Sequence, residues 1–599
     1  MAEVHRELET TYAVDGDAVL PDLVGALPRG HTVTVATHRL RATYVDTADL
    51  RLARAGLTLR RRTGGTDAGW HLKVPEAPNT RSELRLPLGR AADRVPRELE
   101  RLVRGRTRGV PLVPVARITT RRTVHRVADA DGTVLVEVAD DRVEGARLAG
   151  DASDAGVRPD ATTQWREVEV EVVDGGPADL AAVDTLLTAA GLRAVPDASK
   201  LRRVLDVAVD DAGPTPPRTF RRSATSGEVV LAHVRAQVET MAAQDLPVRL
   251  GSPGSVHAMR VATRRLRSAL TSFGPLFLDD AVAPLRADLR ELARALGAAR
   301  DAEVLAERIT ADLADDRRGW AAGAPTATDS GDAGADGGTG AGAAADRGSS
   351  TGVEPLGDAP GDGARGPDAG PVEAQRWVTA ALDAEWRDAR ARALAELDGD
   401  RYAALLVALD AFLAAPPLRH RGSRRARTVL PRLVERTWQK AEAAVRRAEA
   451  VGARDAAGTG DAGRPADAAG RADAAGRGEA AGREAAASGD ARDVLLHEAR
   501  KAAKRSRYAA EAVDGALGGG AHAYAAAMEA LQESLGAHHD TVESRRRLHE
   551  LAALAPSTGT AFALGRLHAH EEVRAAEALS AFRSAWQRAR KPALRRWLR

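Results

Sequence analysis

Residues 167–171 read Glu-Val-Glu-Val-Glu, an alternation of carboxylates and valines that is typical of a β-strand. Successive residues of a strand point to opposite faces of its sheet, so the three glutamates share one face and the two valines lie on the other. This segment therefore predicts a sheet with one apolar face and one acidic face.

The same period-two placement of charge recurs throughout residues 1–208. The other charged members are Glu7, Glu9, Arg60, Arg62, His71, Lys73, Arg81, Glu83, Arg85, Glu137 and Asp141. Acidic strands are separated along the chain from basic ones. A solvated sheet face would explain any single strand, but if the sheet closes, these faces line a tunnel with carboxylates on one side and guanidinium groups on another.

Charges inside such a tunnel are costly to bury unless something bridges them. A divalent cation on the carboxylates, with a polyanion between that cation and the arginines, would satisfy both signs. Mg²⁺ and Mn²⁺ both accept ligand sets made only of oxygen, and both bind phosphate. The sequence therefore predicts a phosphate ligand together with Mg²⁺ or Mn²⁺.

The chain of 599 residues is long enough for several domains, and its aromatic content of only 3% favours helical cores of Leu, Val and Ala. We predict a strand-rich domain over residues 1–208, a Pro/Ser/Arg linker over 209–225 and a helical domain over 226–599. Two tracts rich in Gly, Ala and Asp, at about 321–372 and 452–490, are predicted to be disordered insertions between helices.

The helical part contains an internal repeat. Its two copies read His257-Ala-Met-Arg260-Val-Ala-Thr-Arg264-Arg265-Leu-Arg267 and His497-Glu-Ala-Arg500-Lys501-Ala-Ala-Lys504-Arg505-Ser-Arg507. Each copy is followed at a similar distance by a second match, Leu296-Gly-Ala-Ala-Arg-Asp301 or Leu535-Gly-Ala-His-His-Asp540. On a helix the first, fourth, eighth and eleventh positions of each copy fall on one arc. The repeat predicts a basic helix face that binds an anion. The alternative is a helix face whose charges form salt bridges or are solvated.

Residues 1–208 resemble the CYTH (triphosphate tunnel) domain. The supporting motifs are Glu7-Leu-Glu9, Tyr44-Val-Asp46-Thr47, Gly56-Leu-Thr-Leu-Arg60-Arg-Arg62, Trp70-His-Leu-Lys73, Arg81-Ser-Glu83, the strands around Glu137–Asp141 and Glu167–Glu171, and Ser199-Lys200. The resemblance implies an eight-stranded antiparallel β-barrel that binds triphosphate-containing ligands, often with metal-dependent hydrolysis.

The resemblance also implies roles for individual residues. Those expected to bind the metal are Glu7, Glu9, Asp141, Glu169 and Glu171, with Glu137 assisting. Those expected to hold the phosphates are Arg60, Arg62, Lys73, Arg121 and Lys200. The family's first motif ends in a Lys tied to catalysis, and in this chain that position is Thr11. Since Thr supplies no charge, we assign no catalytic residue and expect slow turnover or none.

Residues 226–599, with their two insertions, resemble the CHAD domain, which commonly follows a CYTH domain. The resemblance implies an all-α, duplicated helical bundle that binds inorganic polyphosphate through basic helices around a central groove. The residues expected to contribute are His257, Arg260, Arg264, Arg265, Arg267, His497, Arg500, Lys501, Lys504, Arg505 and Arg507. The whole chain is then a multi-domain α+β protein.

The leading functional hypothesis is a polyphosphate-binding protein whose barrel binds inorganic triphosphate and, with Mg²⁺ or Mn²⁺, hydrolyses its terminal phosphate. One alternative is a non-catalytic polyphosphate-binding module, and another is a hydrolase or cyclase of an organic triphosphate. The chain has no cysteine, which excludes disulfides and thiolate metal sites. It also has no P-loop or dinucleotide-binding glycine pattern.

Nucleic acid could also bind a basic helix face, but no stacking aromatic residues are interleaved with the repeat. No apolar run resembles a signal peptide or a membrane span. We therefore expect a cytoplasmic protein without a membrane partner, which could associate with polyphosphate granules.

Overall fold

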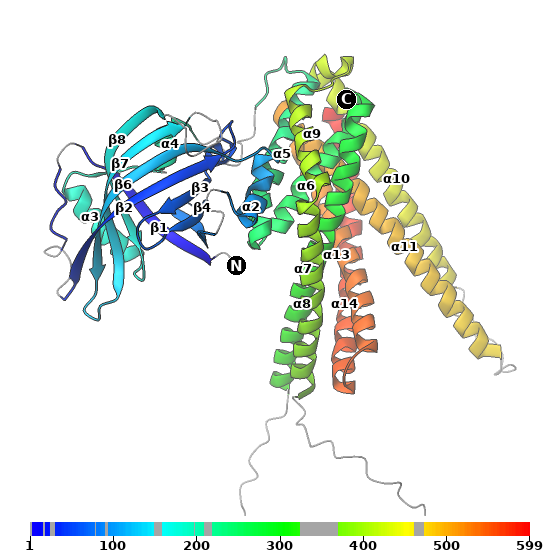
Figure 1. Ribbon diagram of the computed structural model, residues 1–599. Helices are drawn as coiled ribbons and strands as arrows, with labels where there is room; N and C mark the ends of the chain where they lie inside the picture. The colour runs from blue at the N-terminus through cyan, green and yellow to red at the C-terminus, as the bar shows by residue number, and fades with distance from the viewer. Residues whose placement is uncertain are drawn as a thin grey trace, which may run out of the picture. The chain divides into compact units, whose positions relative to one another are not determined.

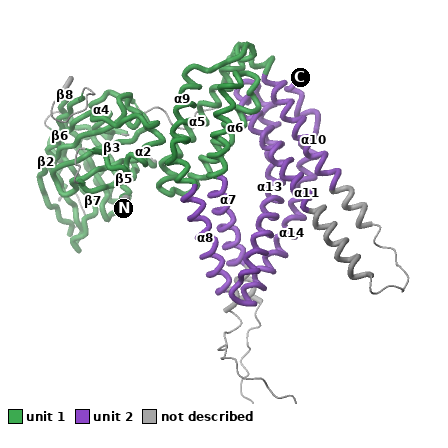
Figure 2. Tube along the Cα trace, turned by 45° about the vertical axis from the view of Figure 1, so that its right-hand side comes forward, with its two compact units in different colours: residues 1–296, 393–429 green, residues 297–392, 430–599 purple. Residues whose placement is uncertain are grey.

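The computed structural model describes most of the chain. The described residues are 3–15, 18–23, 30–77, 79–89, 94–148, 159–196, 198–208, 219–323, 369–460 and 473–599. The chain divides into two compact units (Figure 2). The first unit consists of residues 1–296 and 393–429, and the second of residues 297–392 and 430–599.

The first unit contains a closed sheet of antiparallel strands (Figure 1). Its strands are β1 (Glu3–Ala13), β2 (Thr32–Asp46), β3 (Thr58–Thr63), β4 (Gly69–Ala77), β5 (Thr80–Pro87), β6 (Val113–Ala128), β7 (Val134–Leu148) and β8 (Pro159–Val172). They pair in the order β5-β4-β3-β2-β6-β7-β8-β1, and β1 pairs back with β5. The short β9 (Arg193–Ala194) adds to β1. The predicted eight-stranded antiparallel barrel is therefore confirmed.

The alternation in the sequence decides which face of the barrel wall is apolar. Val168 and Val170 are fully buried on the outer face, where they pack with Leu187 of helix α3 (Pro177–Ala189). The glutamates between them point to the inner face. The strand register sets Asp141 of β7 beside Glu167 of β8, and Thr11 of β1 beside Glu169. The interior therefore collects the charged side chains of neighbouring strands.

Helix α4 (Lys200–Leu205) follows the barrel strands. Its N-cap is Ser199, whose Oγ accepts a hydrogen bond from the backbone N–H of Arg202. Leu201 and Leu205 are buried in an apolar cluster with Tyr44, Ile118 and Val143 from the barrel wall. This packing fixes the beginning of the helix, and so directs Lys200 toward the charged interior.

Helices from both sides of the predicted linker belong to the first unit. They are α1 (Arg51–Arg54) and α2 (Arg97–Thr107) from the barrel segment, and α5 (Ser226–Leu250), α6 (Ser255–Ser272), the 3₁₀ turns η1 (Gly274–Leu276) and η2 (His420–Ser423), and α9 (Asp400–Ala414) from the helical segment. Residues 209–218 of that linker lie outside the described residues. The compact unit thus extends past the predicted domain boundary.

A close approach between α2 and α5 holds the two segments together. Gly105 of α2 lies so near Asp245 of α5 that a Cβ on the glycine would be 2.4 Å from the carboxyl carbon of that aspartate. Asp245 is only 1% exposed, and it accepts a hydrogen bond of 2.7 Å from Nε of Arg249. Burial raises the pKa of Asp245. Arg108, at the end of α2, pairs with Asp410 of α9 at 3.1 Å.

Long helices make up the second unit. The elements contributing to it are α7 (Asp279–Gly323), α8 (Ala369–Asp398), α10 (Ala426–Gly460), α11 (Asp473–Glu511), α12 (Asp514–Leu517), α13 (Gly519–Ala553), α14 (Thr558–Ala589) and the 3₁₀ segment η4 (Pro592–Leu598), of which α7, α8 and α10 belong partly to the first unit. An apolar cluster joins α7, α8, α13 and α14 through residues such as Ile309, Val378, Leu551 and Leu564. Among the described helices, none has both the length and the hydropathy that crossing a bilayer requires.

The two tracts predicted to be disordered are only partly described. Residues 324–368 and 461–472 lie outside the described residues. The remaining parts continue the helices on either side, most extensively over 452–460 in α10 and 473–490 in α11. Alanine-rich sequence has a high helix propensity even where it lacks large apolar residues. Disorder of the two insertions stays a prediction.

The approach of α2 to α5 predicts opposite effects for two helical glycines. Gly105→Ala should lower the free energy of unfolding of the first unit by about 1–3 kcal/mol, because the buried, hydrogen-bonded Asp245 must move. Gly565→Ala, in α14, meets nothing within 4 Å, and should raise stability by up to about 1 kcal/mol because alanine favours the helix. Denaturant unfolding of both variants measures the contrast. Equal effects would contradict the close approach.

Candidate functional site

Three carboxylates inside the barrel converge on one ammonium group. The Nζ of Lys200 lies 3.0 Å from Asp141, 2.6 Å from Glu167 and 2.5 Å from Glu169. Burial by itself would lower the pKa of Lys200, but the three carboxylates outweigh it and raise that pKa well above its ordinary value. Lys200 therefore stays protonated throughout the physiological pH range.

Arg122 of β6 joins the same cluster. Its guanidinium group makes a bidentate pair with Asp141, at 2.8 Å and 2.6 Å, and also pairs with Glu169. Such fork-shaped pairing fixes the geometry of both partners. Burial opposes ionisation of Glu169, yet Lys200 and Arg122 hold its pKa well below the usual value.

A second group of ion pairs surrounds the carboxylates of β1. Lys73 lies 2.6 Å from Glu7 and 3.4 Å from Glu9. Arg81 pairs with Glu9 at 2.9 Å, and Arg85 pairs with Glu7 at 3.0 Å. Burial nevertheless raises the pKa of Glu7, even though Lys73 opposes the shift.

Glu83 is the centre of a third group, on the basic side of the barrel. It lies 3.3 Å from Arg60 and 3.1 Å from Nδ1 of His71, and it also pairs with Arg85. Burial would raise the pKa of Glu83, but the hydrogen bond from His71 and the nearby cations lower it strongly. Arg62 is bound in turn by Asp67.

The acidic side fits a divalent cation. Oxygen atoms of Asp141, Glu167 and Glu169 lie within 4.8 Å of one another, as a shared ion would require. Farther along β8, burial and the nearby Glu7 raise the pKa of Glu171 to about 7. This crowding of negative charge favours an added cation. The donors are all oxygen atoms, which suits Mg²⁺ or Mn²⁺.

Most of the predicted tunnel residues meet inside the barrel. The metal set Glu7, Glu9, Asp141, Glu169 and Glu171 and the phosphate set Arg60, Arg62, Lys73 and Lys200 all take part in the buried charge network. Glu137 pairs with Arg126 at 2.7 Å.

The placement of Arg121 in the tunnel is wrong. Arg121 is exposed on the outer face of β6, and its neighbour Arg122 points inward. Both are arginines, so the sequence does not show which of them points inward; the register of β6 against β2 and β7 decides it.

Sequence reasoning also left several interior residues outside the predicted set. Besides Arg122 they are Glu83, Arg85 and Glu167. Glu83, Arg85 and Glu167 belong to the same period-two alternation that identified the predicted residues, so a signal for them was present. Their closeness to Lys200 or to Arg60 depends on the closure of the barrel.

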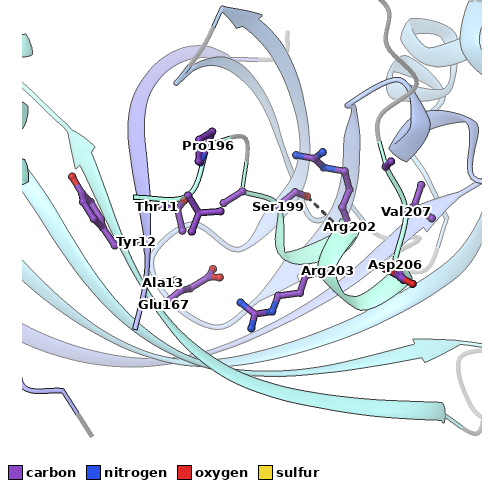
Figure 3. A pocket seen from close by; sticks show the side chains of 13 residues that line it. Thr11, Tyr12, Ala13, Glu167, Pro196, Ser199, Arg202, Arg203, Asp206 and Val207 are labelled. Carbon is purple, nitrogen blue, oxygen red and sulfur yellow. Dashed lines mark hydrogen bonds between the residues drawn. The ribbon is translucent and has the colours of Figure 1, made fainter. Parts of the chain in front are cut away.

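Thr11 lines a pocket of about 410 Å³ next to this network (Figure 3). The pocket lies between β1, β8 and α4, and Glu167 belongs both to its lining and to the Lys200 cluster. On the basic side, a cavity of only about 20 Å³ is lined by residues that include Tyr44, Arg60, Arg62, Arg122 and Lys200.

The first copy of the helical repeat forms α6, in the first unit. Met259, Ala262, Leu266 and Ala269 are buried along one face of this helix. His257 is exposed on it, and Arg260, Arg264, Arg265 and Arg267 are partly exposed. Each of these five residues has an interaction partner.

The second copy lies on α11, in the second unit, and its basic face is opposed by carboxylates. Arg507 pairs with Glu511 and Glu529, both at 2.6 Å, and Lys501 pairs with Glu498 at 3.0 Å. The salt-bridged alternative therefore describes part of this face. His497, Lys504 and Arg505 are partly exposed on the same helix.

The two motifs of the second copy meet in space. Guanidinium atoms of Arg500 lie 3.4 Å from where a Cβ on Gly536 would be, and Arg500 is 3.8 Å from Asp540. The imidazole rings of His497 and His539 lie 4.2 Å apart, and burial lowers the pKa of His497 to about 4. In this copy, Gly536 and Asp540 therefore both lie against Arg500 of the basic helix.

Comparison with known proteins finds two domain families, one after the other along the chain. The CYTH domain family matches residues 5–205, and the CHAD domain family matches residues 232–549. The chain is 32% identical over 580 residues to the "Uncharacterized protein MT2285" of Mycobacterium tuberculosis (strain CDC 1551 / Oshkosh), covering 95% of this chain and 93% of that protein.

Solved structures of similar proteins are more distant. PptA from Streptomyces chartreusis is 18% identical, with a TM-score of 0.40, over 61% of this chain and 100% of that one. The CHAD domain from the plant Ricinus communis is 23% identical, with a TM-score of 0.38, over 62% of this chain and 95% of that one. From the two family matches and the relative that spans nearly its whole length, the chain belongs to the CHAD domain family and carries a CYTH domain in front of its CHAD domain.

Proposed function

We propose that the barrel binds inorganic triphosphate and releases its terminal phosphate with the help of Mg²⁺ or Mn²⁺, while the helical repeat binds inorganic polyphosphate. The observation that carries the barrel assignment is the buried charge network, in which Lys200 and Arg122 bind the same carboxylates. A linear polyanion with a divalent cation presents the same two signs of charge, and could bind both sides at once.

Asp141, Glu167 and Glu169 would hold the cation, since their oxygen atoms already lie close enough together. When bound, the cation supplies Lewis-acid stabilisation of phosphoryl oxygens. The ammonium of Lys200 lies among the same oxygen atoms, so it would turn from the carboxylates toward a phosphate. Lys200 is thus expected to have a negatively charged partner both with and without a bound phosphate.

The basic side would bind the phosphoryl groups by the same kind of exchange. The cavity of about 20 Å³ next to Arg60, Arg62 and Arg122 is too small for a triphosphate while the present ion pairs persist. A phosphate oxygen would replace Glu83 at Arg60, or Asp141 at Arg122. Each cation therefore stays neutralised, which limits the energy that the exchange requires. Fixed guanidinium groups then stabilise the charge that develops on the leaving phosphate.

A barrel that binds triphosphate without hydrolysing it is the second candidate, and Thr11 favours it. The tunnel binds its ligand through side chains that this chain retains, whereas the catalytic Lys of the family is absent at position 11. The same assay separates the two candidates, because a binding module would retain affinity for triphosphate and release no phosphate.

Two adjacent arginines provide a matched test of the tunnel. Arg122→Ala should lower kcat/KM for triphosphate hydrolysis roughly 100-fold, because a buried donor to the phosphoryl oxygens is lost. Arg121→Ala removes the same side chain from the outer face and should leave the rate unchanged. The rate of orthophosphate release with Mg²⁺ or Mn²⁺ is measured for both variants. EDTA should abolish this release by removing the metal.

The proposed hydrolysis is wrong if the unaltered protein releases no orthophosphate with either metal. The tunnel assignment itself fails if triphosphate also does not bind, as measured by calorimetry, or if Arg121→Ala and Arg122→Ala behave alike.

The helical repeat has a separate test. Arg260→Ala combined with Arg500→Ala should weaken binding of long-chain polyphosphate by roughly 100-fold or more, since each charge-assisted contact contributes about 1.5–3 kcal/mol. Arg546→Ala is the control, because this exposed side chain pairs with Glu543 and Glu550 of its own helix. Affinity is measured by calorimetry at several salt concentrations, and its salt slope should become shallower in the double variant.

Unchanged affinity in the double variant would mean that the repeat has a purely structural role. Displacement of polyphosphate by duplex DNA at equal phosphate concentration would assign the face to nucleic acid instead.

A further inference from the structure

The pocket beside Thr11 is lined by groups from three elements. Thr11 and Ala13 come from β1, Glu167 comes from β8, and Ser199, Arg202 and Arg203 come from the beginning and body of α4. Its volume of about 410 Å³ is far larger than the cavity on the basic side of the tunnel. The pocket therefore has room for a phosphoryl group next to the carboxylate cluster.

Arg203 is held over the pocket wall by Trp165. The guanidinium carbon of Arg203 lies 4.9 Å from the centre of the indole ring, a cation–π arrangement. The indole Nε1 in turn donates a hydrogen bond of 2.7 Å to Glu167. One aromatic ring thus connects a positive charge to a carboxylate that also binds Lys200.

The backbone is shaped for this contact at Gly145 of β7. A Cβ on Gly145 would lie 2.3 Å from the side chain of Val204 in α4 and 3.2 Å from the ring of Trp165. Only a residue without a side chain allows α4 and the indole to come together at this point. The close approach of α4 to Trp165 is therefore fixed by packing, and the exposed Arg203 side chain lies over the indole ring.

Arg203 differs from the tunnel cations in its partners. Lys73, Arg81, Arg122 and Lys200 each have carboxylate partners. Within the described part of the chain, Arg203 forms no ion pair with a carboxylate, and its guanidinium group lies against the face of Trp165. Its charge is therefore available to an anion in the pocket.

The neighbouring Arg202 is a weaker candidate. Its backbone N–H donates a hydrogen bond to Oγ of Ser199 at the helix cap, and the residue has a further interaction partner. In Figure 3 the side chain of Arg203 extends toward the side of the pocket where Glu167 lies, whereas that of Arg202 extends away from it. Arg203 is therefore the cation that faces the carboxylate cluster.

We infer that this pocket is an additional phosphate subsite, in which Arg203 supplies the positive charge that Thr11 does not. The inference rests on the proposed function of the tunnel. The ligand is a terminal phosphoryl group of the substrate or the orthophosphate that is released. Thr11 and Ser199 supply hydroxyl groups, and the guanidinium group can bind two phosphate oxygens at once. Since an arginine stays protonated, Arg203 positions and neutralises the phosphate and does not accept a proton.

Substitutions at positions 11 and 203 test this subsite together. Arg203→Ala should lower kcat/KM for triphosphate hydrolysis roughly 10- to 100-fold, because a charge-assisted contact contributes about 1.5–3 kcal/mol. Arg203→Lys should retain most of the activity, since it keeps the charge. In the Arg203→Ala background, Thr11→Lys should restore the rate by placing an ammonium group in the same pocket. Arg121→Ala, on the outer face of the barrel, is the control.

Binding measurements separate this inference from the proposed hydrolysis. If the unaltered protein releases no orthophosphate, hydrolysis fails as a proposal, but calorimetry with triphosphate still tests the subsite. Arg203→Ala should then weaken binding at least tenfold, and the added Thr11→Lys should recover it. The subsite is refuted if Arg203→Ala matches the unaltered protein in both assays, or if Thr11→Lys gives no recovery.

Discussion

The ion cluster of Lys200 with Asp141, Glu167 and Glu169 is the constraint on which the barrel interior depends. It joins two adjacent strands to the helix that follows the barrel, and it does so where Asp141 is fully buried. Removing one partner would leave a buried charge without compensation, which is strongly destabilising. The packing of Leu201 and Leu205 against the barrel wall brings the ammonium group to this point. Apolar burial therefore places the charge, and the charge in turn orders the carboxylates.

The remaining interior charges follow the same rule of mutual neutralisation. Lys73 and Arg85 bind Glu7, while Arg60 and His71 bind Glu83. A site built in this way can accept a ligand with both signs of charge by exchanging partners, without ever leaving a cation bare. The pKa of Glu171, raised to about 7 by burial and by neighbouring carboxylates, marks the part of the interior where negative charge is in excess. The helical repeat uses carboxylates similarly, at Arg507 and Lys501.

Much of this arrangement could be predicted from the sequence. The alternation around Glu167–Glu171 and its counterparts on other strands indicated a sheet with a charged inner face, because the side-chain period of a strand is two. The repeated His/Arg motif likewise indicated two related basic helices, and α6 and α11 contain them. The alanine-rich residues 473–490 continue α11, since lack of large apolar residues does not prevent alanine from forming a helix.

The sequence by itself thus determined the period of each element and the chemical character of each face. Only the tertiary structure decided which of two adjacent arginines faces the interior, because a shift of one residue in strand register reverses every side chain, and Arg121 and Arg122 are chemically identical. It likewise placed Arg203 over the ring of Trp165, whose indole N–H donates a hydrogen bond to Glu167, across a separation in sequence that no local pattern spans. Local periodicity is a property of consecutive residues, whereas these contacts depend on barrel closure and on the approach of α4 permitted by Gly145.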